Sequence, residues 1–268
     1  MASADTTIRL RTAAPAATRR WLAALSILGN IGLNYWANTH PFNGQTMGAV
    51  SAKYPTLLTP AGYAFSIWGL IFLALTIYAI WQLLPAQRHT RLPDVVAQPL
   101  TVASGATAAW VVLFAYELIE ASVAMMLVIL VALIVAYGRA HRQVLARKAP
   151  RWTSMPLALY LGWISVASVL NITIGLRELG WQTPTNITVL LTLLLLALVV
   201  GLALVISNVK YEVVFSAAVV WALVAIWVAR RVEYSELGWA ALAGAVVVAV
   251  GSAVLGLRKR HKRHKRIR

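Results

Sequence analysis

Long apolar stretches separated by short polar segments run along the whole chain. A helix needs about 20 mostly apolar residues to cross the ~30 Å hydrocarbon core of a bilayer. Stretches near that length predict spanning helices at 21–38, 61–84, 99–117, 120–138, 154–176, 185–206, 211–229 and 237–257. The pattern therefore predicts an all-α polytopic membrane helix bundle of about eight transmembrane helices. Seven is the alternative count, because only Glu117 to Ser122 separates the third stretch from the fourth.

The composition agrees with a membrane protein and excludes several chemistries. Of the 268 residues, 60% are hydrophobic and 12% charged, whereas soluble domains carry roughly 25% charged residues. The chain has no cysteine, which excludes disulfides, thiolate nucleophiles and cysteine-ligated metals. Its five histidines lie in loops or the tail, away from any carboxylate at metal-ligand spacing. We therefore expect no catalytic residue, no metal site and no required cofactor. The close carboxylates Glu117 and Glu120 are better explained as a negative cap on an outer hairpin.

Basic residues concentrate in four segments, which are the N-terminal arm (1–20), 87–94, 138–151 and the tail (258–268). With eight helices all four segments lie on one side of the membrane. Basic loops stay in the cytoplasm, so both termini are predicted to be cytoplasmic, with Arg230 and Arg231 as exceptions on the opposite side. The tail has no aromatic residues to stack on bases. We expect it to contact anionic lipid of the bilayer and to bind no nucleic acid.

Residues 39–59, called the entry loop below, connect the first two predicted helices. The entry loop is long and nearly uncharged but contains several large apolar residues. Long loops in compact proteins are usually functional or disordered, and the apolar residues favour packing on the protein. After it comes TPAG, where Thr59 would cap the second helix and Pro60 would occupy its first turn. Gly62 would allow close approach by a lid, a helix or a ligand.

Aromatic residues lie on one face of each of three predicted helices. Residues spaced by three, four or seven positions share a helix face. The stripes are Phe65, Trp68 and Phe72 in the second helix, Trp110 and Phe114 in the third, and Tyr160 and Trp163 in the fifth. Thr107 and Asn171 lie at membrane depth, where polar groups usually face a partner or a cavity. Two interpretations stay open, which are core packing and a ligand cavity between these helices.

Three segments resemble the TspO/MBR family of tryptophan-rich sensory or translocator proteins, and their order is the family's order. LTPAGYAFSIWGLIFL is similar to the motif of the family's second helix. ATAAWVVLF is similar to its third-helix motif, and PLALYLGWISVASVLNITI to its fifth. The resemblance covers about residues 21–180 and implies a five-helix bundle followed by three additional helices over 181–257. The chain departs from the motifs at Ala61, Phe72 and Thr107.

The resemblance implies a flat hydrophobic ligand, such as a porphyrin or another tetrapyrrole, in a pocket closed by the entry loop. It also implies an integral protein of the bacterial cytoplasmic membrane. The expected ligand-binding residues are Pro60, Gly62, Phe65, Trp68, Phe72, Thr107, Trp110, Phe114, Tyr160, Trp163 and Asn171. The alternative functions are a small-molecule transporter and a tryptophan-dependent enzyme that degrades its ligand. Gly244 and Gly251 favour close packing of the last helix within the chain, with a homodimer face as the alternative.

Overall fold

The structure is a computed structural model that describes residues 16–181, 183–210 and 213–265. That part of the chain contains helices and no strand, which confirms the predicted all-α membrane bundle. The long helices are α1 (Ala16–Thr39), α3 (Ile67–Leu83), α4 (Arg91–Ala115), α5 (Ile119–Leu145), α6 (Met155–Glu178), α7 (Thr185–Lys210), α8 (Val213–Arg230) and α9 (Ser235–Lys265). The short elements are α2 (Met47–Lys53) and the 3₁₀ turns η1 (Phe42–Gly44), η2 (Gly62–Ser66), η3 (Pro85–Gln87) and η4 (Arg151–Ser154). Residues 1–15 of the predicted arm and 266–268 of the tail lie outside the described residues.

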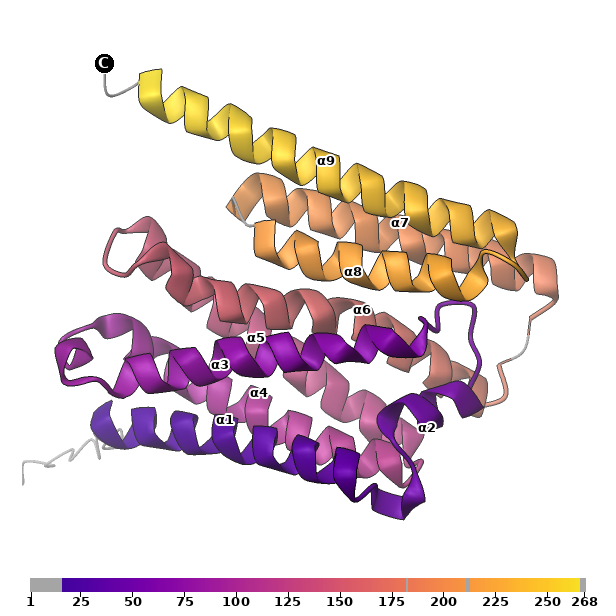
Figure 1. Cartoon of the computed structure of the whole chain (residues 1–268), viewed down its shortest axis with the longest axis horizontal. Coiled ribbons are helices and arrows are strands. Elements are labelled where there is room, and N and C mark those ends of the chain that lie inside the picture. The colour runs from indigo at the N-terminus through magenta and orange to yellow at the C-terminus, as the bar shows by residue number, and fades with distance from the viewer. Residues whose placement is uncertain (1–15, 182, 211–212, 266–268) are drawn as a thin grey trace, which may run out of the picture.

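The long helices run alternately in opposite directions, with the start of α1, the α3–α4 and α5–α6 connections and the end of α9 at the left in Figure 1. Within the described residues, seven helices are long and apolar enough to cross a membrane. They are the seven long helices from α3 to α9. The 24-residue α1 is not among them, although it lies alongside α3 and α4 (Figure 1). A membrane-spanning α1, and with it the count of eight, stays a prediction.

The bundle has two groups of helices, joined through α6. Helices α1, α3, α4 and α5 pack together on one side, and α7, α8 and α9 pack together on the other (Figure 1). Helix α6 contacts α5 and α3 on one side and α8 on the other. The approach to α8 is close, because a Cβ at Gly162 would lie 2.6 Å from the Phe215 carbonyl oxygen and 2.9 Å from the Ala218 Cβ. The three C-terminal helices therefore form part of the same packed body.

The small residues of α9 are used for packing within the chain. A Cβ at Gly244 would lie 2.8 Å from Val200 Cγ2, and one at Gly251 would lie 2.6 Å from Leu204 Cδ2. Both neighbours belong to α7, so the two glycines let α9 and α7 approach closely. This face of α9 is covered by the chain itself.

The structure corrects two predicted helix starts. Thr59 does not cap the second helix and Pro60 is not in its first turn, because the element opens as η2 with Ala61 at the N-cap position. The Thr59 hydroxyl accepts instead from the Thr56 N–H of the entry loop, at 3.0 Å. Helix α4 begins at Arg91 rather than at 99, so the second predicted basic segment largely belongs to η3 and the first turn of α4.

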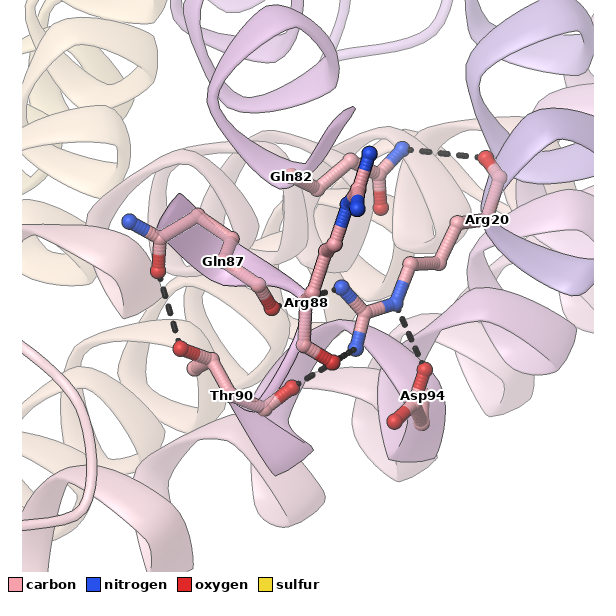
Figure 2. A network of polar contacts seen from close by, with 6 residues as sticks. All are labelled: Arg20, Gln82, Gln87, Arg88, Thr90 and Asp94. Carbon is pink, nitrogen blue, oxygen red and sulfur yellow. Dashed lines mark hydrogen bonds and ion pairs between the residues drawn. The ribbon is translucent and has the colours of Figure 1, made fainter. Parts of the chain in front are cut away.

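Arg20 joins the start of α1 to the connection between α3 and α4. Its side chain is 7% exposed, and its Nε donates to Asp94 Oδ1 at 2.6 Å. The two terminal nitrogens donate to backbone carbonyls of Gln87 and Thr90 at 2.7 and 2.9 Å. Figure 2 shows the guanidinium enclosed by these groups, with the Gln82 amide on the Arg20 carbonyl. A buried guanidinium is stable only when it is paired in this way. Arg20 of the basic arm therefore has a structural role, because it fixes α1 to the α3–α4 connection.

Candidate ligand-binding site

A cavity lies where α3, α4 and α6 meet α7 and α8, and residues of the entry loop form part of its lining. Its volume is about 40 Å³, enough for roughly three water molecules. Seven of the eleven residues expected from the sequence line it: Pro60, Phe65, Trp68, Trp110, Phe114, Trp163 and Asn171. The aromatic stripes of three helices thus meet around one space.

The other four expected residues lie outside the lining of this cavity. Tyr160 and Thr107 are fully buried and hydrogen-bond each other through their hydroxyls. Trp68 contacts the rings of Tyr160 and Phe72, at centroid distances of 5.6 and 5.2 Å. Tyr160 and Phe72 therefore pack next to Trp68, and Thr107 is bonded to Tyr160, instead of lining the cavity. Gly62 is exposed, and no protein atom lies within 4 Å of the place its Cβ would occupy, so neither a helix nor the entry loop approaches it closely in this structure.

Asn171 is held by side chains from two neighbouring helices. Trp110 Nε1 in α4 donates to Asn171 Oδ1 at 3.0 Å. Asn171 Nδ2 in turn donates to Ser122 Oγ in α5 at 3.2 Å. Buried polar groups are costly unless paired, and this chain of hydrogen bonds pairs them while fixing the orientation of the Trp110 ring.

Two polar groups in the cavity wall have no such partner. Trp163 Nε1 and Ser51 Oγ are buried and make no hydrogen bond within the described residues, and both residues line the cavity. Trp163 supplies a donor, and the Ser51 hydroxyl can donate or accept. Among the residues that the structure describes, no charged side chain lines the cavity. The site therefore offers large apolar rings together with two groups able to hydrogen-bond a ligand.

Glu117 holds the entry loop at the α4–α5 turn. Its carboxylate accepts from Lys53 Nζ at 2.7 Å, from Gln45 Nε2 at 2.9 Å and from the Tyr54 hydroxyl at 2.9 Å. Hydrogen bonds from Lys53, Gln45 and Tyr54 lower the pKa of Glu117 to about 2. Partial burial, together with the hydrogen bond to Glu117, raises the pKa of Tyr54 to about 12. The expected negative cap on this hairpin is thus also an anchor for the entry loop.

The backbone at Glu117 supports a specific role for its side chain. Its φ is 57°, a left-handed conformation that non-glycine residues rarely adopt and that usually favours glycine at a helix end. A glutamate there accepts local strain, which the three hydrogen bonds to the entry loop offset.

Two arginines hold the other part of the entry loop. Arg177 Nη1, at the end of α6, donates to the Pro55 carbonyl at 2.5 Å. Arg230 Nη2, at the end of α8, donates to the Thr56 carbonyl at 2.8 Å. Arg230 is one of the two cations that the charge pattern left on the unexpected side, and this contact gives it a partner. Sequence reasoning missed it because the acceptor is a backbone carbonyl.

The wall contributed by α7 and α8 was also missed. Leu196, Val199, Ala222, Leu223 and Ile226 line the cavity. Helix α8 is fixed to the segment before α3 by two hydrogen bonds: Trp221 Nε1 donates to the Ala64 carbonyl, and the Ala61 N–H donates to the Ala225 carbonyl, both at 3.0 Å. The stripe of Ala218, Ala222 and Ala225 was an available signal, because small residues at helical spacing mark close helix packing in membranes.

The fold and the cavity define a class, a polytopic α-helical membrane protein with an aromatic chamber inside its bundle. The family model described as TSPO-like protein matches residues 20–254, and the chain belongs to that family. The match includes α7, α8 and most of α9, to which the motif resemblance did not extend. Among curated proteins and among solved structures, none matches the chain.

Proposed function

We propose that the chain is a TspO-like tryptophan-rich sensory protein that binds a flat hydrophobic, tetrapyrrole-like ligand in the aromatic cavity. One observation carries the proposal: Trp68, Trp110 and Trp163 come from three helices and line one buried space. Large rings give a planar ligand wide contact at little cost in rotamer entropy. The unpartnered Trp163 Nε1 provides a donor for an acceptor atom of that ligand.

The size of the cavity requires that the site opens on binding. Ligand pockets usually measure roughly 300–1,000 Å³, far more than the 40 Å³ of this cavity. The entry loop is the element suited to move, since its Ser51 and Leu58 form part of the lining. In this proposal the structure corresponds to the closed state, and a tetrapyrrole enters as the entry loop lifts.

The test is a titration of the purified protein with tetrapyrroles, sterols and carotenoid-like molecules, followed by tryptophan quenching. Trp68→Ala should weaken tetrapyrrole binding about thirtyfold, because losing a well-packed anchor costs upwards of ~2 kcal/mol. Trp239→Ala is the matched control, since Trp239 is 60% exposed on α9 and outside the cavity lining. Equal affinities in the two variants, with only the thermal stability of Trp68→Ala lowered, would mean that the rings merely pack the bundle.

A further inference from the structure

A second, larger hollow lies on the outside of the bundle, between α4 and α5. Its volume is about 480 Å³, against about 40 Å³ for the internal cavity. Val102 of α4 and Leu127, Val131 and Val135 of α5 line it. These side chains are 37–60% exposed, so the groove opens to the surroundings of the bundle.

The Arg139 guanidinium lies at one end of this groove, bound to a backbone carbonyl that Pro99 leaves free. Pro99, which also lines the groove, lies inside α4 and has no N–H to donate to the carbonyl four residues earlier. That carbonyl belongs to Val95, and Arg139 Nη1 of α5 donates to it at 3.0 Å. The guanidinium is therefore held at a fixed position, and it keeps further N–H groups for another acceptor.

No carboxylate neutralises Arg139 in the described part of the chain. Asp94 of α4 is paired with Arg20. Glu117 and Glu120 lie at the opposite end of α5, about 19 residues or more from Arg139 along the chain, or roughly 28 Å of helix. Arg142, three residues beyond Arg139, is exposed and adds positive charge at the same end.

The groove has the length of one leaflet of a bilayer. From Leu127 to Arg139 is 12 residues of α5, or about 18 Å at 1.5 Å per residue. Half of a ~30 Å hydrocarbon core is about 15 Å. An apolar groove of that length, ending in a cation, matches an acyl chain joined to an anionic headgroup.

We propose that the α4–α5 groove is a binding site for an anionic phospholipid. The acyl chain lies along Val102, Leu127, Val131 and Val135, and the headgroup phosphate accepts from the free N–H groups of Arg139. A planar guanidinium is the side chain best suited to bind phosphate oxygens in pairs. The Gln98 amide, also in the groove lining, provides a second polar contact. This site is separate from the aromatic cavity and does not depend on the function proposed for it.

The test measures lipid retention by native mass spectrometry of the purified protein. The probes are phosphatidylglycerol and phosphatidylcholine with identical acyl chains. The wild type should retain phosphatidylglycerol about tenfold more strongly, since a charge-assisted hydrogen bond to the phosphate is reinforced by the net negative headgroup. Arg139→Gln should remove this preference, whereas Arg151→Gln, at an exposed arginine outside the groove, should keep it.

A second variant keeps the test decisive if Arg139→Gln fails to fold. Val131→Trp places a large ring in the groove at a side chain that is 60% exposed, and should lower retention of both lipids at least fivefold. Ile80→Trp, at an equally exposed site on α3, is the control and should retain both lipids. Unchanged retention in Val131→Trp would overturn the proposal.

The other occupant to exclude is a second copy of the chain. Because the natural chain has no cysteine, Val128→Cys, within the groove lining, introduces a single thiol. The proposal expects a monomer after mild oxidation in native membranes. Efficient disulfide-linked dimers would show that another copy covers the groove and would overturn the proposal.

Discussion

At the scale of single residues, Asn171 shows how the bundle uses a polar group at membrane depth. It accepts from Trp110 and donates to Ser122, so one side chain links α4, α5 and α6. Thr173, two residues away, donates only to the Val169 carbonyl of its own helix. The sequence places both polar residues at a similar depth in the membrane, and only the structure distinguishes their roles.

Asn171→Leu should lower the thermal stability clearly more than Thr173→Val. Removing the amide leaves Trp110 Nε1 without its partner, whereas the Ser122 hydroxyl keeps its bond to the Ile119 carbonyl. A buried group left unsatisfied costs about 1–3 kcal/mol. Thr173→Val loses one local bond within its helix. Thermal unfolding in detergent, followed by tryptophan fluorescence, measures both. Equal midpoints in the two variants would show that the Asn171 bridge adds no stability.

Glu117 predicts how the entry loop responds to pH. Its pKa falls from about 4.3 in the unfolded chain to about 2 in the folded chain. The contribution of the charged carboxylate is complete above about pH 4.3 and is lost as the pH falls through about 2. The entry loop should therefore stay anchored at neutral pH and loosen only in strong acid, while Glu117→Ala should loosen it at pH 7.

Thiol labelling of Ser51→Cys measures this opening, since Ser51 is a residue of the entry loop that lines the cavity and is 2% exposed. Labelling at pH 7 should speed up when Glu117→Ala is added. Ala52→Cys is the control, because Ala52 is exposed and should label rapidly in either background. Ser51→Cys labelling that Glu117→Ala does not change would show that the carboxylate does not anchor the entry loop.

At the scale of elements, glycines that lack a side chain allow neighbouring helices to pack closely. A Cβ at Gly251 would lie 2.6 Å from Leu204 Cδ2 of α7, so that side chain would have to shift, whereas a Cβ at Gly69 of α3 would have nothing within 4 Å. Gly251→Leu should therefore force α9 from α7 and destabilise the fold by about 1–3 kcal/mol. Gly69→Leu should be close to neutral. Thermal unfolding of the two variants makes the comparison, and a neutral Gly251→Leu would mean that α9 is not closely packed on α7.

Helix positions were predicted well from apolar runs, and helix ends less well. The apolar core of α4 begins near residue 99, so Arg91 and Asp94 looked like loop residues. The helix includes them because Arg20 pairs Asp94 and binds the carbonyls just before α4. The predicted start of the second helix was wrong for a similar reason. Thr59 has a hydroxyl suited to capping, but it bonds the Thr56 N–H within the entry loop.

At the scale of the molecule, both termini should be cytoplasmic in a bacterial cytoplasmic membrane if α1 spans. Reporter fusions at Gln87, at Ala146 and after the C-terminus should all report cytoplasm. The first two sites belong to the α3–α4 and α5–α6 connections, and these connections lie at the same end of the alternating helices as the end of α9 (Figure 1). A fusion before α1 decides between eight and seven spans, since it reports cytoplasm only if α1 crosses. A C-terminus on the opposite side from Gln87 would contradict the topology.

Only the part of the cavity wall that α3, α4 and α6 contribute could be predicted from the sequence. Aromatic stripes on α3, α4 and α6 differ from ordinary lipid-facing residues, so periodicity found them. Leu196 and Val199 of α7 do not differ, because leucine and valine suit a lipid face and a cavity wall equally. Helix α7 is also mostly exposed, with 22% of its apolar window buried. Nothing in its sequence separates the two faces, and only packing against α8 and α9 assigns them.

The anchoring of the entry loop has a consequence for the rate of ligand exchange. Glu117 in the α4–α5 turn, Arg177 at the end of α6 and Arg230 at the end of α8 hold it, so opening requires that bonds at several points break together. Lid motions of this kind take microseconds to milliseconds or longer. For a ligand that enters beneath the entry loop, the observed association rate should level off at high concentration, at the opening rate. Bound ligand would then leave only as often as the entry loop opens, so occupancy would persist after the concentration of free ligand has fallen.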